Sequence, residues 1–146
     1  MIPADIQHNH EGNPMKLMAL FAPTFLAATL LASHAAQAAG DAVAGKKVFN
    51  KCTACHDAKA DKNKVGPSLL GVVGRTAGTL ESYLAKFSDN MKEAGAGGLV
   101  WDEANLTAYL RDPKAVIPKG KMAFPGLKDD ADLANVIAYL SADPKP

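Results

Sequence analysis

The chain has 146 residues, of which 48% are hydrophobic and 21% are charged, and its formal net charge at pH 7 is +1. This length allows one domain or at most two, and the composition is that of a soluble globular protein with one added apolar run. The near-neutral balance gives no signal of nucleic-acid binding.

The N-terminal region has the pattern of an export signal. Residues 17–33 form an apolar run without a charge, which follows Lys16 and leads to an Ala-x-Ala sequence ending at Ala38. This pattern predicts a signal peptide over residues 15–38, cleaved after Ala38, and a periplasmic mature protein. A retained membrane anchor is the alternative, although the run is at the short edge of a spanning length and Pro23 interrupts it.

Residues 1–14 do not fit such a signal, because they contain two acidic residues and no lysine or arginine. Translation is therefore expected to begin at Met15, with residues 1–14 as a non-native upstream extension. Residues 39–146 then form the mature domain. Removal of one lysine and two acids leaves this domain with 15 basic and 13 acidic side chains, a net charge of +2.

Residues 41–51 are expected to form the first helix of the mature domain. Asp41 is its expected N-cap, and apolar residues recur at helical spacing along one face. Gly45 lies in the middle of this helix, where glycine costs about 1 kcal/mol relative to alanine. A close crossing by another helix is the expected reason for this glycine.

The segment after this helix carries the clearest chemical motif. Cys52 and Cys55 are separated by two residues, and His56 follows directly. Two thiols at this spacing can each form a thioether with one porphyrin, and the adjacent imidazole can bind the iron. A redox-active cysteine pair, a disulfide and a zinc site are the alternatives, and no later cysteine or histidine supplies a fourth zinc ligand. The motif favours covalent haem attachment.

The middle of the chain mixes loops with a weaker helical pattern. Residues 57–75 are polar and lysine-rich, then rich in turn-forming residues, so they are expected to form a surface loop and turns. Apolar side chains at helical spacing over residues 80–87 favour a helix, with Thr79 as its cap. Residues 94–98 are expected to be a glycine-rich loop.

Two further helices and a long loop complete the predicted fold. Asp102 is expected to cap a helix that Pro113 ends. Residues 118–126 form a loop stiffened by prolines, and residues 129–141 form the clearest helix, with acidic residues in the first turn and an apolar stripe. There is no convincing strand. The predicted fold class is all-α, with three main helices and one or two short ones around the haem.

Taken together, these residues resemble the class I cytochromes c, the small c-type cytochromes of bacteria and mitochondria. The resemblance covers essentially all of residues 39–146, and it implies the cytochrome c fold and one covalent haem c. The matching positions, in the order of the family, are Gly45 with Phe49, residues 52–56, Gly66-Pro67, Gly74-Arg75, Trp101, Tyr109, Pro113, Met122 with Phe124, and Ala138-Tyr139-Leu140.

A second axial ligand opposite His56 would make the iron six-coordinate. Met91 and Met122 are the only thioethers in the mature domain. Met122 lies in the proline-flanked loop and matches the ligand position of the family, so His56 and Met122 are the expected axial ligands. Met91 is the alternative, and its ordinary role would be to fill a gap in the core.

The resemblance implies roles for four further residues. The carbonyl of Pro67 is expected to accept a hydrogen bond from the axial histidine and to fix its orientation. Tyr109 is expected to lie near the methionine sulfur. Arg75 and the indole N–H of Trp101 are expected to donate hydrogen bonds to a buried haem propionate.

The chain also departs from the pattern of the family. Gly120 stands where the family has threonine, and Phe87 stands where it often has tyrosine, so two hydroxyl donors to the propionates are missing. The family often has an irregular loop before a serine-capped short helix. By this resemblance a helix is expected after Ser88, and residues 80–87 correspond to the irregular loop, which is the alternative to the helix that their spacing favours. Residues 94–98 lengthen the loop before Trp101.

Six-coordinate haem with histidine and methionine ligands has no open iron position and suits electron transfer rather than oxygen activation. The expected function is that of a soluble, monomeric one-electron carrier and not an enzyme. By resemblance, it would shuttle electrons between a quinol-oxidising cytochrome complex and a terminal oxidase or photosynthetic reaction centre. The alternatives are a haem peroxidase, a ligand-binding sensor with a displaceable methionine, or a haem subunit of a larger oxidoreductase.

Five lysines near the two ligand segments resemble the lysines that surround the haem edge in the family. They are Lys51, Lys64, Lys114, Lys121 and Lys128. A ring of this kind would steer acidic partners at low salt and loosen with added salt. A generic solvated surface is the alternative explanation for these side chains.

Overall fold

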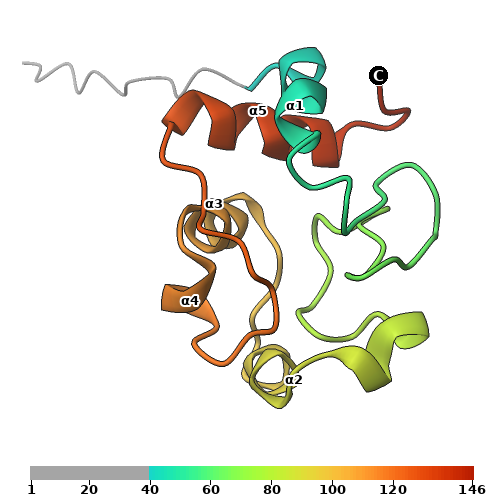
Figure 1. Cartoon of the computed structure of the whole chain (residues 1–146), viewed down its shortest axis with the longest axis vertical. Helices are drawn as coiled ribbons and strands as arrows, with labels where there is room; N and C mark the ends of the chain where they lie inside the picture. Colours follow the sequence, from blue (N-terminus) through green and yellow to red (C-terminus); the bar gives the residue numbers. More distant parts are fainter. Residues whose placement is uncertain (1–39) are drawn as a thin grey trace, which may run out of the picture. The chain divides into compact units, whose positions relative to one another are not determined.

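The computed structural model describes residues 40–146, so the expected signal peptide and upstream extension lie outside the described residues. The helices in this part of the chain are α1 (Ala42–Phe49), the 3-10 helix η1 (Glu81–Lys86), α2 (Asp89–Ala96), α3 (Glu103–Arg111), α4 (Pro113–Val116) and α5 (Asp130–Ser141) (Figure 1). Extended pairing in residues 40–146 is limited to one antiparallel bridge between Thr76 and Val100. The all-α prediction is confirmed.

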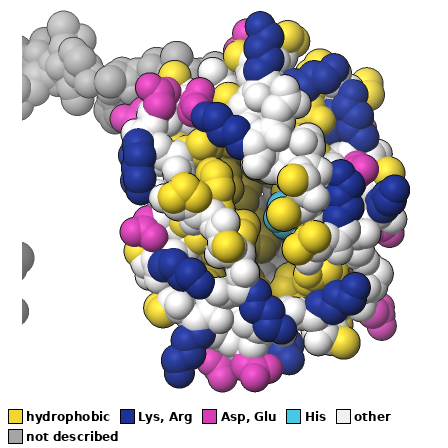
Figure 2. Space-filling model, viewed as in Figure 1, with side chains coloured by type: hydrophobic (Ala, Val, Ile, Leu, Met, Phe, Trp, Pro, Cys, Tyr) yellow, Lys and Arg dark blue, Asp and Glu magenta, His cyan; other side chains and the backbone are white. Residues whose placement is uncertain are grey.

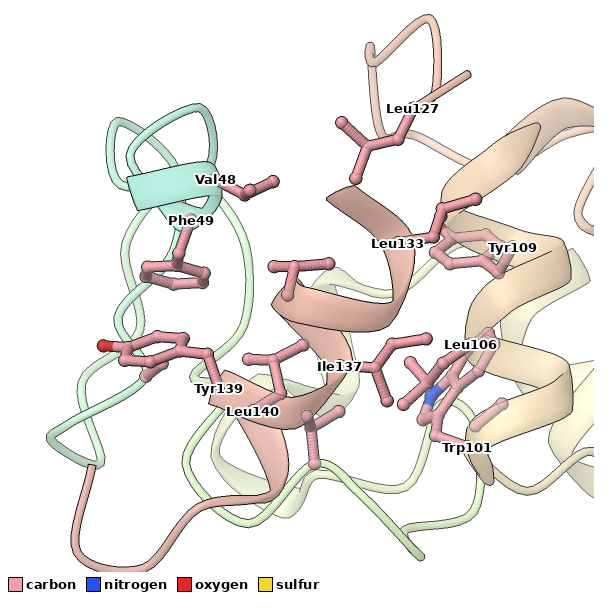
Figure 3. Close-up of a cluster of buried hydrophobic side chains, with 14 of the residues drawn as sticks. Val48, Phe49, Trp101, Leu106, Tyr109, Leu127, Leu133, Ile137, Tyr139 and Leu140 are labelled. Atoms are coloured by element: carbon pink, nitrogen blue, oxygen red, sulfur yellow. The ribbon is translucent and has the colours of Figure 1, made fainter. Parts of the chain in front are cut away.

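α1 and α5, from opposite ends of the described chain, cross in direct contact (Figure 1). A Cβ atom on Gly45 would lie 1.9 Å from the carbonyl oxygen of Asn135 and 2.9 Å from the Cβ of Tyr139. The rings of Phe49 and Tyr139 pack beside this point, with centroids 5.1 Å apart (Figure 3). The close crossing expected at Gly45 is confirmed, and α1 ends two residues earlier than expected.

The α-helices begin at polar side chains that accept hydrogen bonds from the free amides of the first turn. These N-caps are Asp41, Ser88, Asp102, Asp112 and Asp129. The helix expected after Ser88 is therefore present. Asp112 ends α3 and also caps α4, so Pro113 occupies the first position of α4, where its missing N–H costs nothing.

The α-helix favoured over residues 80–87 is wrong in type, because η1 is a 3-10 helix. Its N-cap is Leu80, which provides no side-chain hydrogen bond, and the Thr79 hydroxyl instead donates to the Thr76 carbonyl at 2.8 Å. Only Tyr83 of η1 is buried, and Leu84 is 46% exposed. One buried residue in six gives the segment little packing energy to hold a regular amphipathic helix.

The glycine-rich loop expected at residues 94–98 is wrong for its first three residues, because α2 continues to Ala96. Gly95 lies inside α2 and is buried. A Cβ atom there would lie 1.8 Å from the carbonyl oxygen of Ala77, so glycine allows α2 to pack directly on that backbone. The composition of the segment indicated a loop, whereas the glycine serves close packing.

The core forms where α5 packs against α3 and against the segment before α3 (Figure 3). The predicted apolar stripe of α5 is buried there and consists of Leu133, Val136, Ile137 and Leu140. Leu106 and Tyr109 face this stripe from α3, with Trp101 beside them. Among residues 40–146, none of the helices has the length and apolar character needed to cross a bilayer.

Candidate functional site

A largely apolar cavity of about 330 Å³ opens between the segment that follows α1 and the loop that precedes α5. Figure 2 shows it as a hollow with a histidine side chain in its wall. The cavity is lined by all eight residues predicted to bind the cofactor: Cys52, Cys55, His56, Pro67, Arg75, Trp101, Tyr109 and Met122. Folding thus brings together residues that are up to 70 positions apart in the sequence.

The two cysteines lie in tight turns that follow α1 directly. The amide of Cys52 donates to Phe49 O at 2.8 Å, and the amide of His56 donates to Cys52 O at 2.9 Å. These turns place two free thiols and one imidazole on the same wall of the cavity. Burial raises the pKa of the Cys52 thiol, against a smaller opposing effect of the neighbouring Lys51 ammonium.

The His56 ring is held by one hydrogen bond and one close backbone contact. Its Nδ1 lies 2.8 Å from the carbonyl oxygen of Pro67. A carbonyl can only accept, so Nδ1 carries the hydrogen and Nε2 keeps a free lone pair for a metal. Burial is the main cause that lowers the pKa of His56, which favours this neutral form. A Cβ on Gly66 would lie 2.3 Å from Cε1 of the ring, so only glycine allows this placement.

Met122 reaches the cavity from the loop between α4 and α5. Its sulfur lies 4.0 Å from the hydroxyl of Tyr109, a long contact for a hydroxyl donating to sulfur. Burial raises the pKa of Tyr109 to about 12, so the hydroxyl keeps its proton at neutral pH. Met91 lines the cavity from α2 as well, so both candidate methionines reach it. Among residues 40–146, Met122 is the methionine with a hydroxyl at its sulfur.

Arg75 and Trp101 lie side by side, next to the antiparallel bridge between Thr76 and Val100. The amide of Trp101 donates to Arg75 O at 2.9 Å. The guanidinium of Arg75 donates to the carbonyl oxygens of Ser68 and Leu70, which leaves three of its five N–H groups for other acceptors. The indole of Trp101 is buried against Tyr109, with ring centroids 4.8 Å apart.

Sequence reasoning missed Ser68, which is fully buried and organises the loop beside the histidine. Its hydroxyl donates to Ala60 O at 3.0 Å and accepts from the amide of Leu70 at 3.2 Å, while its own amide donates to Asn63 Oδ1 at 2.9 Å. Because Ser68 follows Pro67 directly, this network fixes the carbonyl that holds the His56 ring. A serine next to a Gly-Pro turn was the only signal in the sequence, and it is a weak one.

Each of the five predicted docking lysines is tied to another part of the chain. Lys51 pairs with Asp132 at 2.9 Å, and the other four ammonium groups donate to backbone carbonyl oxygens. Lys51 and Lys121 line the cavity itself. Figure 2 shows lysine and arginine side chains on both sides of the hollow. The structure therefore places positive charge at the mouth of the cavity and limits the freedom of its side chains.

This fold and this cavity define a known class of protein. Residues 42–142 match the family model described as cytochrome c, and the chain belongs to that family. It is similar to a cytochrome c2 iso-2 of Magnetospirillum fulvum, 57% identical over 94 residues that make up 64% of this chain and 93% of that protein. Cytochrome c2 of Rhodospirillum rubrum is 48% identical over 123 residues, 78% of this chain and 89% of that protein.

Solved structures give the same result. Cytochrome c2 from Rhodospirillum centenum superimposes with a TM-score of 0.66 at 38% identity and covers 73% of this chain and 100% of that chain. Cytochrome cH from Methylobacterium extorquens gives a TM-score of 0.60 at 47% identity, over 69% of this chain and 97% of that chain. The protein is thus a c-type cytochrome, an electron-transfer protein rather than an enzyme.

The residues present fit the haem c that this family carries. Two free thiols at the spacing for two thioethers lie on one wall of an apolar cavity, next to an imidazole with a free nitrogen lone pair. Apolar side chains, among them Leu69, Leu106 and Phe124, form much of the remaining lining. This is the chemistry that a covalently attached porphyrin requires.

Proposed function

We propose that this protein is a one-electron carrier whose haem iron is held by His56 on one side and Met122 on the other. The observation that carries the proposal is the single cavity that receives both side chains, with Nδ1 of His56 bound to Pro67 and the sulfur of Met122 beside a hydroxyl. When bound, the haem supplies a one-electron couple between ferric and ferrous iron.

The chain's own residues hold and shield this group. Cys52 and Cys55 attach the haem covalently. The Pro67 carbonyl fixes the plane of the His56 imidazole and raises its basicity as a ligand. The Tyr109 hydroxyl orients the Met122 sulfur. The apolar lining excludes water from the cavity, which favours the less charged, reduced state of the iron site.

Arg75 and Trp101 are the proposed donors to the haem propionates. Three N–H groups of Arg75 remain after its two backbone contacts, and the indole of Trp101 supplies one more. Neither Gly120 nor Phe87 can add a hydroxyl. The propionates therefore depend on few protein donors.

The proposed physiological role is electron shuttling in the periplasm after removal of the signal peptide at Ala38. The donor would be a quinol-oxidising cytochrome complex, and the acceptor a terminal oxidase or photosynthetic reaction centre. Support comes from the relatives named cytochrome c2 and from the lysines at the mouth of the cavity, which suit an acidic docking face.

The test of the axial ligands compares two methionine variants of the holoprotein. The oxidised wild-type protein should show the weak long-wavelength absorption band of methionine-to-iron charge transfer. Met122→Ala should abolish this band, lower the reduction potential and open the iron to added ligands. Met91→Ala, at the other methionine of the cavity, should keep the band. Loss of the band in Met91→Ala and its survival in Met122→Ala would assign the ligand to Met91 instead.

A further inference from the structure

The loop that carries Met122 is weakly held by its own backbone. Among the described residues, positions 121–126 neither donate nor accept a backbone–backbone hydrogen bond. The nearest such bonds on either side are those from the amide of Gly120 to Ile117 O and from the amide of Leu127 to Leu110 O, at 2.9 and 2.8 Å. The position of the Met122 sulfur must therefore depend on side-chain contacts between this loop and its neighbours.

One such contact joins the loop to α2. The backbone amide of Lys119 donates to Asn90 Oδ1 at 3.1 Å, three residues before Met122. A second contact joins the loop to η1, where the Lys121 ammonium donates to Lys86 O at 2.9 Å. The Lys121 side chain is long, exposed and costly to order, whereas Asn90 is short and half-buried, so Asn90 provides the stiffer tie.

The helix that carries Asn90 is held in place at both ends. It is the second residue of α2, whose first turn is capped by Ser88 through the amide of Met91 at 3.2 Å. Farther along, Gly95 packs α2 against the backbone of Ala77. A helix held at both ends presents the Asn90 side chain in one place.

The loop itself offers no replacement for this contact. Gly120 has no side chain with which to bond the cavity wall, and Phe87 opposite has no hydroxyl. The Lys114 ammonium bonds Gly120 O, but it approaches from α4 and not from α2. Asn90 is thus the short polar side chain that links the loop that carries Met122 to α2.

We propose that Asn90 is a positioning residue that holds the Met122 loop against α2 and thereby limits displacement of Met122 from the iron. The inference rests on the proposed function in one respect, namely that Met122 is an axial ligand. Loss of the tie increases the fraction of molecules in which the loop has moved away, and an external ligand then competes with the thioether more effectively.

The test is equilibrium binding of imidazole to the oxidised holoprotein. Asn90→Ala removes the acceptor, and one hydrogen bond of ordinary strength corresponds to imidazole binding that is about three- to tenfold tighter. Asn90→Asp keeps an acceptor oxygen for the Lys119 amide and should restore binding near the wild-type affinity. Glu93→Ala, at an exposed position on the same helix, is the matched control and should bind as the wild type does.

A second readout reports the contact directly. Hydrogen exchange of the Lys119 amide should accelerate in Asn90→Ala and stay at the wild-type rate in Asn90→Asp and Glu93→Ala. Urea unfolding of the same variants separates a loosened loop from a globally weakened fold, since loss of this one contact should raise the unfolding equilibrium constant by no more than the three- to tenfold change in imidazole binding.

Wild-type imidazole affinity and wild-type exchange of Lys119 in Asn90→Ala would overturn the inference. Equal tightening in Asn90→Ala and Asn90→Asp would also overturn it, because the acceptor oxygen would then not matter. If the wild-type protein lacks the methionine charge-transfer band, or if Met122→Ala binds imidazole as the wild type does, the ligand assignment fails and the inference fails with it.

Discussion

Gly66 shows how much of the site depends on a residue that has no side chain. It lets the chain pass within van der Waals distance of the His56 ring while the next carbonyl, that of Pro67, holds Nδ1. A methyl group at this position would lie 2.3 Å from Cε1. The ring and the backbone cannot both stay in place around it.

Gly66→Ala is therefore expected to rotate or displace His56 and to break its bond to Pro67. Insertion of a methyl group at a packed position costs about 1–3 kcal/mol. Urea unfolding of the holoprotein measures this loss, and a changed reduction potential reports the altered ligand. Gly97→Ala is the matched control, because a Cβ there meets its nearest atom at an ordinary 3.4 Å. Equal stability of the two variants would contradict the contact.

At the scale of single residues, the sequence predicted the residues that bind the haem better than the residues that hold them in position. Cys52, Cys55 and His56 are recognisable because their spacing is dictated by one porphyrin. Ser68 and Asn90 carry no such pattern, since their partners are backbone groups, which every residue possesses. Only the folded chain shows which of them come within hydrogen-bond distance.

Among the elements, the crossing of α1 and α5 joins the two ends of the described chain. Two opposing effects act at Gly45 when it is replaced by alanine. Helix propensity favours alanine by about 1 kcal/mol in an open helix. The added methyl group would lie 1.9 Å from the carbonyl oxygen of Asn135, a backbone atom that cannot move without shifting α5.

Gly45→Ala is expected to destabilise the holoprotein by about 2 kcal/mol or more, because the clash with backbone exceeds the gain in propensity. The free energy of urea unfolding measures it. Lys46→Ala, at the exposed neighbouring position, should change stability by less than about 0.5 kcal/mol. A stabilised Gly45→Ala variant would mean that the helices can separate without loss.

The elements also show where sequence patterns mislead. Residues 129–141 were predictable because capping, first-turn acids and an apolar stripe all agree over three turns. Residues 80–87 have the helical spacing without the burial, so they form a 3-10 helix. Residues 94–96 have the composition of a loop, yet they form the last turn of α2 because Gly95 can pack on backbone.

An empty cavity of this size lowers the stability of the whole molecule. The cavity opens to solvent and is lined mostly by apolar side chains, which lack packing partners when nothing fills it. The bound haem must therefore be a main component of the core. A chain without haem is expected to have a much smaller free energy of unfolding.

Replacement of both Cys52 and Cys55 by serine prevents covalent attachment, and the purified chain is expected to lose most of its helical circular dichroism. The wild-type holoprotein is the reference, and the single Cys55→Ser variant should be intermediate because one thioether can still form. A double variant that keeps native helicity without haem would show that the polypeptide core suffices.

The lysines around the cavity act through the field of the whole molecule rather than through single contacts. Charge reversal at Lys64, Lys64→Glu, is expected to slow electron exchange with a purified quinol-oxidising cytochrome complex about two- to tenfold at low ionic strength. The difference in rate between Lys64→Glu and the wild type should disappear with added salt, because the Debye length falls to about 10 Å at 0.1 M ionic strength and is shorter at higher salt.

Lys46→Glu makes the same charge change on α1, at a position outside the five predicted docking lysines, and should have a smaller effect on this rate. A slowing by Lys64→Glu that is equal at all salt concentrations would indicate a structural fault. Such a fault would arise at Thr53, because the Lys64 ammonium donates to Thr53 O at 2.5 Å inside the attachment motif.

The sequence by itself determined the covalent haem motif, the starts of α1, α3 and α5, and the all-α class of this protein. Each of these depends on residues close together in the chain, through the spacing of two thiols, a capping side chain or an apolar stripe. The tertiary structure alone decided other contacts: Gly66 against the His56 ring, Gly95 against Ala77, lysine ammonium groups on backbone carbonyls, and Asn90 on the Lys119 amide. Each of these contacts has a backbone group as one partner, and backbone groups are the same at every residue, so the sequence does not mark them.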